Sequence, residues 1–140
     1  MDGYRFSTEL RVRFNETDLQ GVAHHANHVV WLEVARIAYL DRVEGGYLAL
    51  RETGVDVTTT DVAVRYRAGV RFDDRLRIWV RAVDLRGTRF RFEYVLERLN
   101  EPAGVVGEAS TGHACIDATT LRPTRMPAEL AERFTALEAG

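Results

Sequence analysis

The chain has 140 residues, a length at which a single core buries roughly two-thirds of the unfolded surface, so we expect one domain over residues 1–140. With 46% hydrophobic residues, 29% charged residues and only 3 prolines, the composition excludes disordered and fibrous proteins. The formal net charge of -2 argues against a general nucleic-acid-binding surface, which normally carries a basic excess, although contacts to individual phosphates stay open.

The cysteine content and the N-terminal residues indicate the compartment. Cys115 is the single cysteine, which excludes an internal disulfide and fits a reducing compartment. It falls in an expected strand and is more typical of a core residue than of a nucleophile. Residues 1–14 alternate charged and apolar side chains and lack the continuous apolar run of a signal peptide. We therefore expect a cytoplasmic protein with no membrane and no nucleic-acid partner.

The first elements are a strand and a long apolar helix. Residues 6–14 alternate in polarity, which predicts a half-buried strand that ends at Phe14. A helix follows over residues 29–44, and its central part carries only Glu33 and Arg36 as charges. A helix that is apolar on nearly every side must be surrounded, so we expect a sheet to wrap it. Gly45-Gly46 is expected to stop this helix.

The rest of the chain is expected to be mostly strand. A short helix over residues 47–53 closes at Gly54. Alternating polarity then predicts four strands at residues 57–67, 75–84, 89–98 and 105–116. A short amphipathic helix follows Pro127. This order predicts an α+β protein with the hot-dog fold, a five-stranded antiparallel sheet wrapped around a long central helix.

The candidate chemistry lies between the first strand and the central helix. Asp18 faces a helix N-terminus, whose unpaired N–H groups and partial positive charge can bind a carbonyl oxygen that becomes negative during attack. An ionised carboxylate there can attack a carbonyl or orient a water. Thioesters suit this arrangement because the thiolate leaves with little protonation. The alternative is that Asp18 only closes an Asx turn or caps the helix.

Histidines follow this aspartate closely. His25 could hold the carboxylate, position water or contact the ligand, and alternatively it is a polar residue in the loop. His24 and His28 are spaced to share a helix face, so together with Asp18 or His113 they could ligate a metal. It is disfavoured because no HExxH motif or cysteine pair accompanies it, and we expect no metal and no other cofactor.

Other catalytic motifs are missing from the sequence. There is no GxSxG motif, glycine-rich phosphate loop or Rossmann signature. Arg86, Thr88 and Arg89 form a turn that could meet the phosphates of a carrier, with a solvated turn as the alternative. Gly21 lets the backbone come close to a ligand, and Asn27 is a candidate N-cap of the helix.

A resemblance covers nearly the whole chain. The run 12–39 carries Glu16-Thr17-Asp18, Gly21-Val22, His24-His25 and Asn27 ahead of the apolar helix. It resembles the hydroxybenzoyl-coenzyme A thioesterase family and its bacterial acyl-CoA thioesterase relatives. The resemblance implies a hot-dog fold assembled as dimers or as dimers of dimers, that is homotetramers, with each active site at a subunit boundary.

The resemblance also implies roles for individual residues. By this likeness Asp18 is the catalytic nucleophile or general base, the backbone N–H around His25 polarises the thioester carbonyl, and the His25 side chain matches a histidine that several bacterial members use. Phe14 departs from the pattern, because some bacterial relatives carry a tyrosine there, which puts in doubt any mechanism that needs that hydroxyl. The expected substrate-binding residues are Phe14, Gly21, Val22, His24, Asn27 and Tyr66, and the expected CoA-binding residues are Arg86, Thr88 and Arg89.

The expected function is hydrolysis of an acyl-CoA thioester to the free acid and coenzyme A. One alternative takes the acyl group from an acyl carrier protein, as hot-dog thioesterases associated with polyketide synthesis do. Another is a non-catalytic acyl-CoA-binding module, which would normally bring a DNA-binding segment that 140 residues spent on one fold do not provide. A hot-dog dehydratase is disfavoured because its helix signature is missing. The acyl group stays open, since its pocket would form between subunits.

Overall fold

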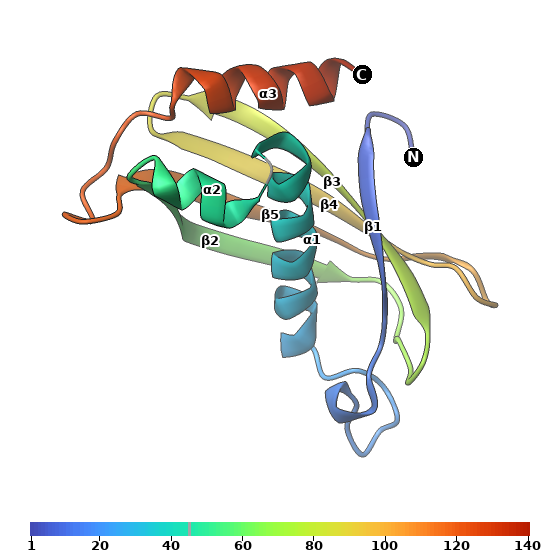
Figure 1. The fold of residues 1–140 in the computed structure, drawn as a ribbon. Coiled ribbons are helices and arrows are strands. Elements are labelled where there is room, and N and C mark those ends of the chain that lie inside the picture. Colours follow the sequence, from blue (N-terminus) through green and yellow to red (C-terminus); the bar gives the residue numbers. More distant parts are fainter. Residues whose placement is uncertain (45) are drawn as a thin grey trace.

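A five-stranded antiparallel sheet bends around one long helix in a computed structural model that describes every residue except Gly45 (Figure 1). The strands are β1 (Phe6–Arg11), β2 (Val55–Tyr66), β3 (Arg75–Arg86), β4 (Arg89–Arg98) and β5 (Gly104–Asp117). The helices are α1 (Ala26–Glu44), α2 (Tyr47–Glu52) and α3 (Ala128–Ala139), and the 3-10 helix η1 (Phe14–Glu16) precedes α1. The strand order β1-β3-β4-β5-β2 makes β1 and β2 the edge strands, and the hot-dog prediction is confirmed.

The alternating pattern of the strands determines the core. Leu76, Ile78 and Val80 of β3 point inward and are fully buried. Four neighbours on β4 do the same, and they are Phe90, Phe92, Tyr94 and Leu96. These rows pack against α1, where Leu32 and Tyr39 are 0% exposed. Burial of each such side chain contributes roughly 1.5–3 kcal/mol, so this packing holds α1 against the sheet.

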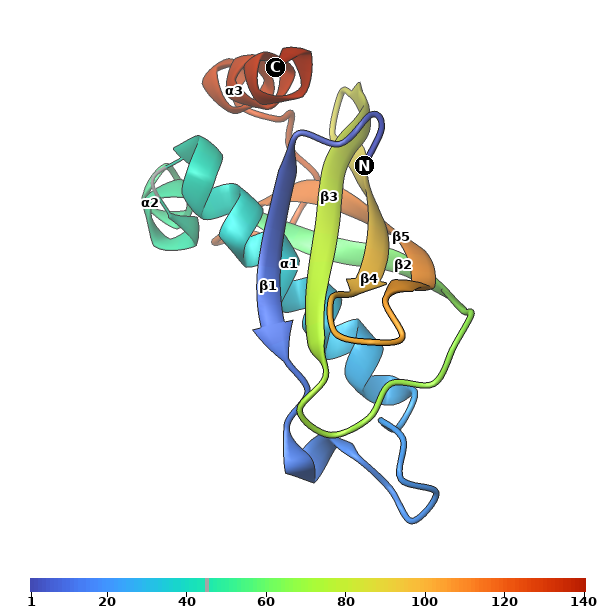
Figure 2. The ribbon, with the colours of Figure 1, turned by 90° about the vertical axis from the view of Figure 1, so that its right-hand side faces the viewer.

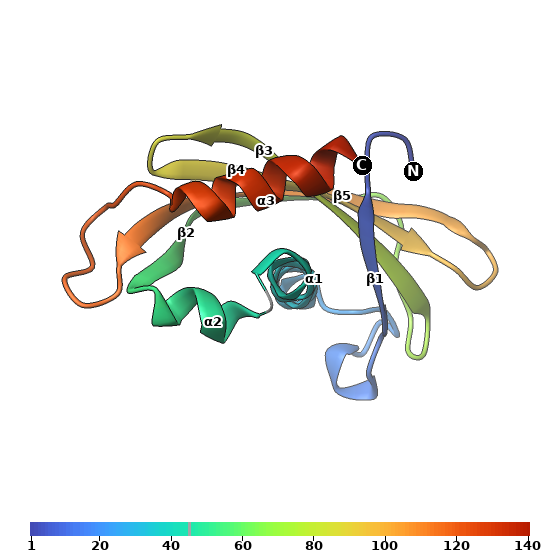
Figure 3. The same cartoon turned by 45° about the horizontal axis from the view of Figure 1, so that its top comes forward.

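The sheet covers only one side of α1. Figure 3 shows the helix nearly end on, with the sheet arched over one side. On the other side Val29, Val30 and Val34 are 41%, 46% and 47% exposed. The expectation of a helix enclosed on all sides is therefore wrong for the single chain. Within the described residues, no helix is long and apolar enough to cross a membrane.

The predicted boundaries fail mainly around the loop that precedes α1. β1 ends at Arg11, and Phe14 lies in η1, where it is 75% exposed and packs edge to face on Phe72. α1 begins at Ala26, earlier than expected. The predicted stop of this helix includes Gly45, which lies outside the described residues. The prediction of α3 is confirmed, since it starts directly after Pro127.

α3 lies at the end of the sheet opposite η1, as Figure 2 shows. The chain leading into it is bound to the β3–β4 turn, because the Met126 N–H donates to the Gly87 carbonyl over 3.1 Å. Near its C-terminus the Glu138 carboxylate accepts hydrogen bonds from the Tyr39 hydroxyl at 2.5 Å and from the Ala82 N–H at 2.7 Å. These contacts fix α3 over the inward-facing rings of the core.

Candidate active site

The loop between η1 and α1 is closed by its own hydrogen bonds. The Asp18 N–H donates to the Val22 carbonyl at 3.0 Å, and the Gly21 N–H donates to the Asp18 carbonyl at 2.9 Å. Gly21 has φ of 80°, a left-handed conformation that favours glycine. The side-chain Oδ1 of Asp18 accepts from the Gln20 N–H at 2.8 Å. The Asx turn is therefore present, and among the described residues Oδ2 of Asp18 makes no hydrogen bond.

A buried carboxylate fastens this loop to the helix. Glu16 is 4% exposed, and its carboxylate accepts from the Arg13 N–H at 2.8 Å and from Trp31 Nε1 at 2.9 Å. Its backbone carbonyl accepts from the His24 N–H and from Asn27 Nδ2. Burial acts to raise the pKa of Glu16, but the hydrogen bonds from Arg13 and Trp31 outweigh it and hold this pKa below its usual value. Sequence reasoning assigned no role to Glu16 beyond the motif.

The N-terminus of α1 carries a free backbone donor. His24 caps the helix through its ring, because Nδ1 accepts from the Ala26 N–H at 3.2 Å. Asn27 is not the N-cap, since it lies inside α1 and its amide donates to the Glu16 and His24 carbonyls. Among the described residues the backbone N–H of His25 has no hydrogen-bond partner. It is available to a ligand next to the positive end of the helix.

These elements enclose a pocket of about 350 Å³. Its lining residues are Asp18, Gln20, Val22, Ala23, His25, His28, Tyr66, Arg67, Ala68, Gly69 and Val70. Tyr66 reaches across from the end of β2, and its hydroxyl donates to the His25 carbonyl at 2.9 Å. The structure thus brings together four expected site residues, Asp18, Val22, His25 and Tyr66. Phe14, Gly21, His24 and Asn27 are not in the pocket wall.

His28 was missed as a site residue and lies in the pocket wall. It is 3% exposed, and burial lowers its pKa although hydrogen bonding to the backbone of His25 and His24 acts to raise it. Its type offered only a weak signal, because a histidine on the first turn of an apolar helix is as typical of the core. No group of three or more His, Cys, Asp or Glu among the described residues is arranged to hold a metal.

The expected CoA-binding residues lie elsewhere in the chain. Arg86 and Arg89 line a second pocket, of about 470 Å³, at the β3–β4 turn, while Thr88 does not. β3 starts near the first pocket and ends at this turn after 12 residues, a rise of about 40 Å. Within one chain, Arg86 and Arg89 therefore lie far from Asp18.

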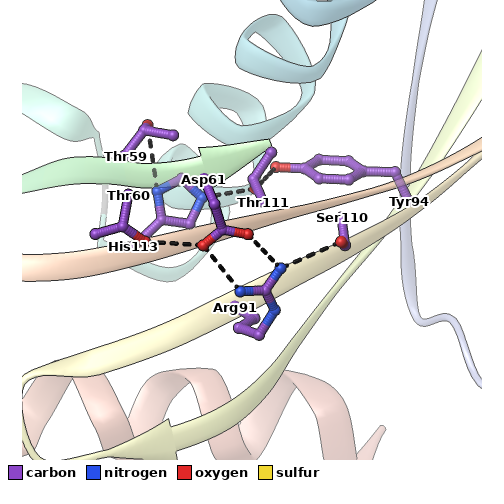
Figure 4. Close-up of polar contacts among 8 residues, drawn as sticks. All are labelled: Thr59, Thr60, Asp61, Arg91, Tyr94, Ser110, Thr111 and His113. Carbon is purple, nitrogen blue, oxygen red and sulfur yellow. Dashed lines mark hydrogen bonds and ion pairs between the residues drawn. The ribbon is translucent and has the colours of Figure 1, made fainter. Parts of the chain in front are cut away.

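Polar side chains around β5 border the second pocket (Figure 4). Arg91 forms an ion pair with Asp61 at 2.8 Å, and this pair passes over Gly112, where a Cβ would lie 2.0 Å from Asp61 Oδ1. On the inner side Thr111 is hydrogen-bonded to Tyr94 and to His113, each at 2.6 Å. Burial lowers the pKa of His113 to about 4, so this imidazole is neutral.

Buried Cys115 takes no part in either pocket. It is 0% exposed, and burial raises the pKa of its thiol to about 11, which confirms the prediction of a core residue rather than a nucleophile.

Comparison with known proteins gives a consistent result. The sequence model of the Thioesterase-like superfamily matches residues 12–134. The chain is 27% identical to the putative acyl-CoA thioesterase YneP of Bacillus subtilis, over 93% of each protein. It is 29% identical to the acyl-CoA thioester hydrolase YbgC of Escherichia coli O157:H7, over 92% of this chain and 95% of that protein. The DHNA-CoA thioesterase of Staphylococcus aureus superposes with a TM-score of 0.86 at 25% identity, over 95% of this chain and 90% of that one.

Proposed function

The chain belongs to the thioesterase-like superfamily, and from this premise we propose that it is an acyl-CoA thioesterase that releases a free acid and coenzyme A. One observation carries the proposal. The carboxylate of Asp18 and the N-terminus of α1, with the unpaired N–H of His25, border the same pocket. A base or nucleophile and an oxyanion donor are the two groups that thioester hydrolysis needs.

The proposed reaction follows from these positions. The carbonyl oxygen of the thioester accepts a hydrogen bond from the His25 N–H, which stabilises the negative charge that develops there. Asp18 uses its free oxygen, Oδ2, to take a proton from water while the water oxygen bonds to the carbonyl carbon. The C–S bond then breaks, and the thiolate receives the proton. Direct attack by Asp18 on the carbonyl carbon is the other form of the same chemistry.

A homo-oligomer completes the coenzyme A site in this proposal. β2 is a long edge strand, and Val62 and Tyr66 on it are 41% and 47% exposed. Antiparallel pairing of two β2 strands about a two-fold axis would set the Tyr66 end of one copy beside the Val55 end of the other. Arg89 on β4 pairs with Ala114 on β5, and Ala114 pairs with Thr58 near the start of β2. Arg89 therefore lies two strand spacings, about 10 Å, from the edge strand β2.

The second copy would therefore bring its arginine pocket towards the first pocket. Arg86 and Arg89 offer guanidinium groups suited to the phosphates of coenzyme A, whereas Arg91 is already paired with Asp61. An acyl chain entering the pocket would then be covered by one copy while the nucleotide is held by the other. The proposal covers dimers and larger assemblies built from them, such as a homotetramer.

Thiol release tests the proposed function. We expect activity on at least one member of a panel of aliphatic and aromatic acyl-CoAs, and a loss of two or more orders of magnitude in Asp18→Asn. The asparagine keeps an oxygen for the Gln20 N–H, so the turn is retained. Asp73→Asn is the matched control, because Asp73 is exposed and lies outside the pocket.

Two outcomes would contradict the proposal. The first is no thiol release from any acyl-CoA by the unmodified protein, with release from acylated carrier protein instead. This result would identify the substrate as an acyl carrier protein thioester rather than an acyl-CoA. The second is equal binding of acyl-CoA by both proteins without hydrolysis of either thioester, which would indicate a binding module.

A further inference from the structure

The side chain of Asn27 bridges two backbone carbonyls beside the pocket. Its Nδ2 donates to the Glu16 carbonyl at 2.9 Å and to the His24 carbonyl at 3.3 Å. These two bonds use both hydrogens of the amide, a neutral group that carries two donors on one atom. Asn27 lies inside α1 and outside the pocket wall, so neither helix capping nor ligand contact explains it. The role of its amide therefore depends on what these two carbonyls hold.

The two carbonyls fix His24 from both sides. The Glu16 carbonyl also accepts from the His24 N–H at 2.8 Å, so the peptide before His24 is attached to Glu16. The His24 carbonyl also accepts from the backbone N–H of Asn27 at 3.0 Å, so the peptide after His24 is bound by two donors of one residue. Nδ2 of Asn27 joins these two attachment points.

The peptide after His24 carries the N–H of His25. A peptide unit is planar and trans, so its N–H points opposite to its carbonyl. Holding the His24 carbonyl against Asn27 therefore sets the direction of the His25 N–H, which has no hydrogen-bond partner among the described residues. His25 borders the same pocket as Asp18. Asn27 thus acts on the one backbone donor that the proposed reaction uses.

The same hydrogen bonds strengthen this donor. A carbonyl that accepts hydrogen bonds draws electron density from the nitrogen of its own peptide, and hydrogen bonds linked in this way strengthen one another by about 10–30% each. The other side of His25 is held as well, because its carbonyl accepts from the Tyr66 hydroxyl at 2.9 Å. A donor whose direction and polarity are set before the substrate binds stabilises developing negative charge most effectively.

We propose that Asn27 is a positioning residue, whose side-chain amide holds and polarises the peptide between His24 and His25 so that the His25 N–H meets the thioester carbonyl oxygen. This inference rests on the proposed function and names a further residue on which its oxyanion donor depends. In this role Asn27 touches neither the substrate nor the attacking water, and it transfers no proton. Its effect falls on the step in which the carbonyl oxygen becomes negative, and therefore on kcat more than on KM.

Thiol release is compared in two variants of this position. Asn27→Ala removes the amide, and Asn27→Gln keeps it on a longer side chain. We expect kcat to fall about 10- to 100-fold in Asn27→Ala, with KM changed by less than about threefold, and to be partly retained in Asn27→Gln. Asn15→Ala is the matched control and should keep full activity, because Asn15 is an exposed asparagine of η1 outside the pocket wall.

A role confined to the stability of α1 predicts a different order. Alanine and glutamine both favour helices more than asparagine does, so both variants would then be as active as the unmodified protein. Urea unfolding establishes that each variant is folded under the assay conditions. Full kcat in a folded Asn27→Ala protein, or a glutamine variant no more active than the alanine variant, would overturn the role of Asn27.

A binding measurement keeps the inference separate from turnover. The probes are a coenzyme A ketone, in which a methylene replaces the thioester sulfur, and the matching coenzyme A thioether without the carbonyl. The unmodified protein should bind the ketone more tightly, and Asn27→Ala should lose about fivefold of this preference. A general loosening of the loop would weaken both probes equally and leave their ratio unchanged. An unchanged ratio in Asn27→Ala, or no preference in the unmodified protein, therefore contradicts the inference.

The outcomes distinguish the two proposals. Full kcat in a folded Asn27→Ala protein removes only the role of Asn27, while thiol release by the unmodified protein still supports the thioesterase. Absence of thiol release from every acyl-CoA removes the proposed function, and the ratio of ketone to thioether binding then still decides whether Asn27 directs the His25 N–H towards a carbonyl.

Discussion

Glu16→Ala is the substitution that should reveal most about how the catalytic loop is held. Glu16 lies between the strand β1 and the helix α1, and it is 4% exposed. Its removal leaves Trp31 Nε1 without an acceptor inside the core, where Trp31 is 2% exposed. The Arg13 N–H loses its acceptor as well, but Arg13 is exposed and water can replace it.

The expected magnitude follows from these two losses. A buried donor left unpaired costs about 1–3 kcal/mol, and a hydrogen bond to a charged acceptor contributes about 1.5–3 kcal/mol. Water compensates most of the second loss, so we expect the free energy of unfolding to fall by about 2–4 kcal/mol. This is a large part of the roughly 5–15 kcal/mol that stabilises a typical domain. Thiol release should fall too, because the loop that carries Asp18 loses its attachment to α1.

Urea unfolding at one fixed protein concentration measures the first effect, with midpoints compared at equal m-values. Glu9→Gln is the matched control, since Glu9 is an exposed carboxylate paired with Arg77. Equal midpoints for Glu16→Ala and the control would refute the reasoning.

The pH dependence gives a second, independent check with Glu16→Gln. The folded pKa of Glu16 lies below its ordinary value of 4.5, so the contribution of this carboxylate to the free energy of unfolding is complete above about pH 4.5 and is lost as the pH falls through the lower folded pKa. The glutamine variant cannot titrate there, and its loss of stability on acidification should be smaller than that of the unmodified protein. Identical acid dependence of the two proteins would show that the carboxylate is not held as described.

Two further predictions concern the far end of the sheet. Glu138→Ala removes the acceptor of the Tyr39 hydroxyl and the Ala82 N–H, and it should lower the free energy of unfolding by about 2–3 kcal/mol, measured by urea unfolding; an unchanged midpoint would contradict the anchoring of α3. The double change Arg86→Ala and Arg89→Ala should raise KM for an acyl-CoA several-fold and leave KM for the corresponding acyl-pantetheine, which lacks the nucleotide phosphates, unchanged. Equal effects on both substrates would contradict phosphate binding at this turn.

The regular strands could be predicted from the sequence because the alternation of polar and apolar residues within each strand determines which side is buried. β4 was predicted as residues 89–98 and has these bounds, since its alternating rings can only face one way on a pleated strand. The loop before α1 could not be predicted in the same way. Phe14 continues the alternation of β1 in sequence, but Glu16 turns the chain into η1 by accepting from Arg13 and Trp31.

The same distinction between local and long-range contacts applies to the candidate site. Asp18, Val22 and His25 are close in sequence, and the turn that groups them can be predicted from residue types alone. His28 differs, because its burial depends on Tyr66 at the end of another strand, and no local pattern shows whether that contact forms. The resemblance to a family supplied Tyr66 but gave His28 no role.

The prediction that α1 is enclosed on all sides is wrong for the single chain, and the cause can be read from the exposed residues. Val30 and Val34 repeat at helical spacing, which predicts burial, yet about half of each is exposed in the single chain at 46% and 47%. An apolar pattern reflects burial in the assembled protein, and a sequence does not separate burial by its own sheet from burial by another copy. The edge strand β2 is open in the same sense, since its outer side has no partner strand among the described residues. Both features, and the distance from Arg86 to Asp18, find one explanation in the homo-oligomer proposed above.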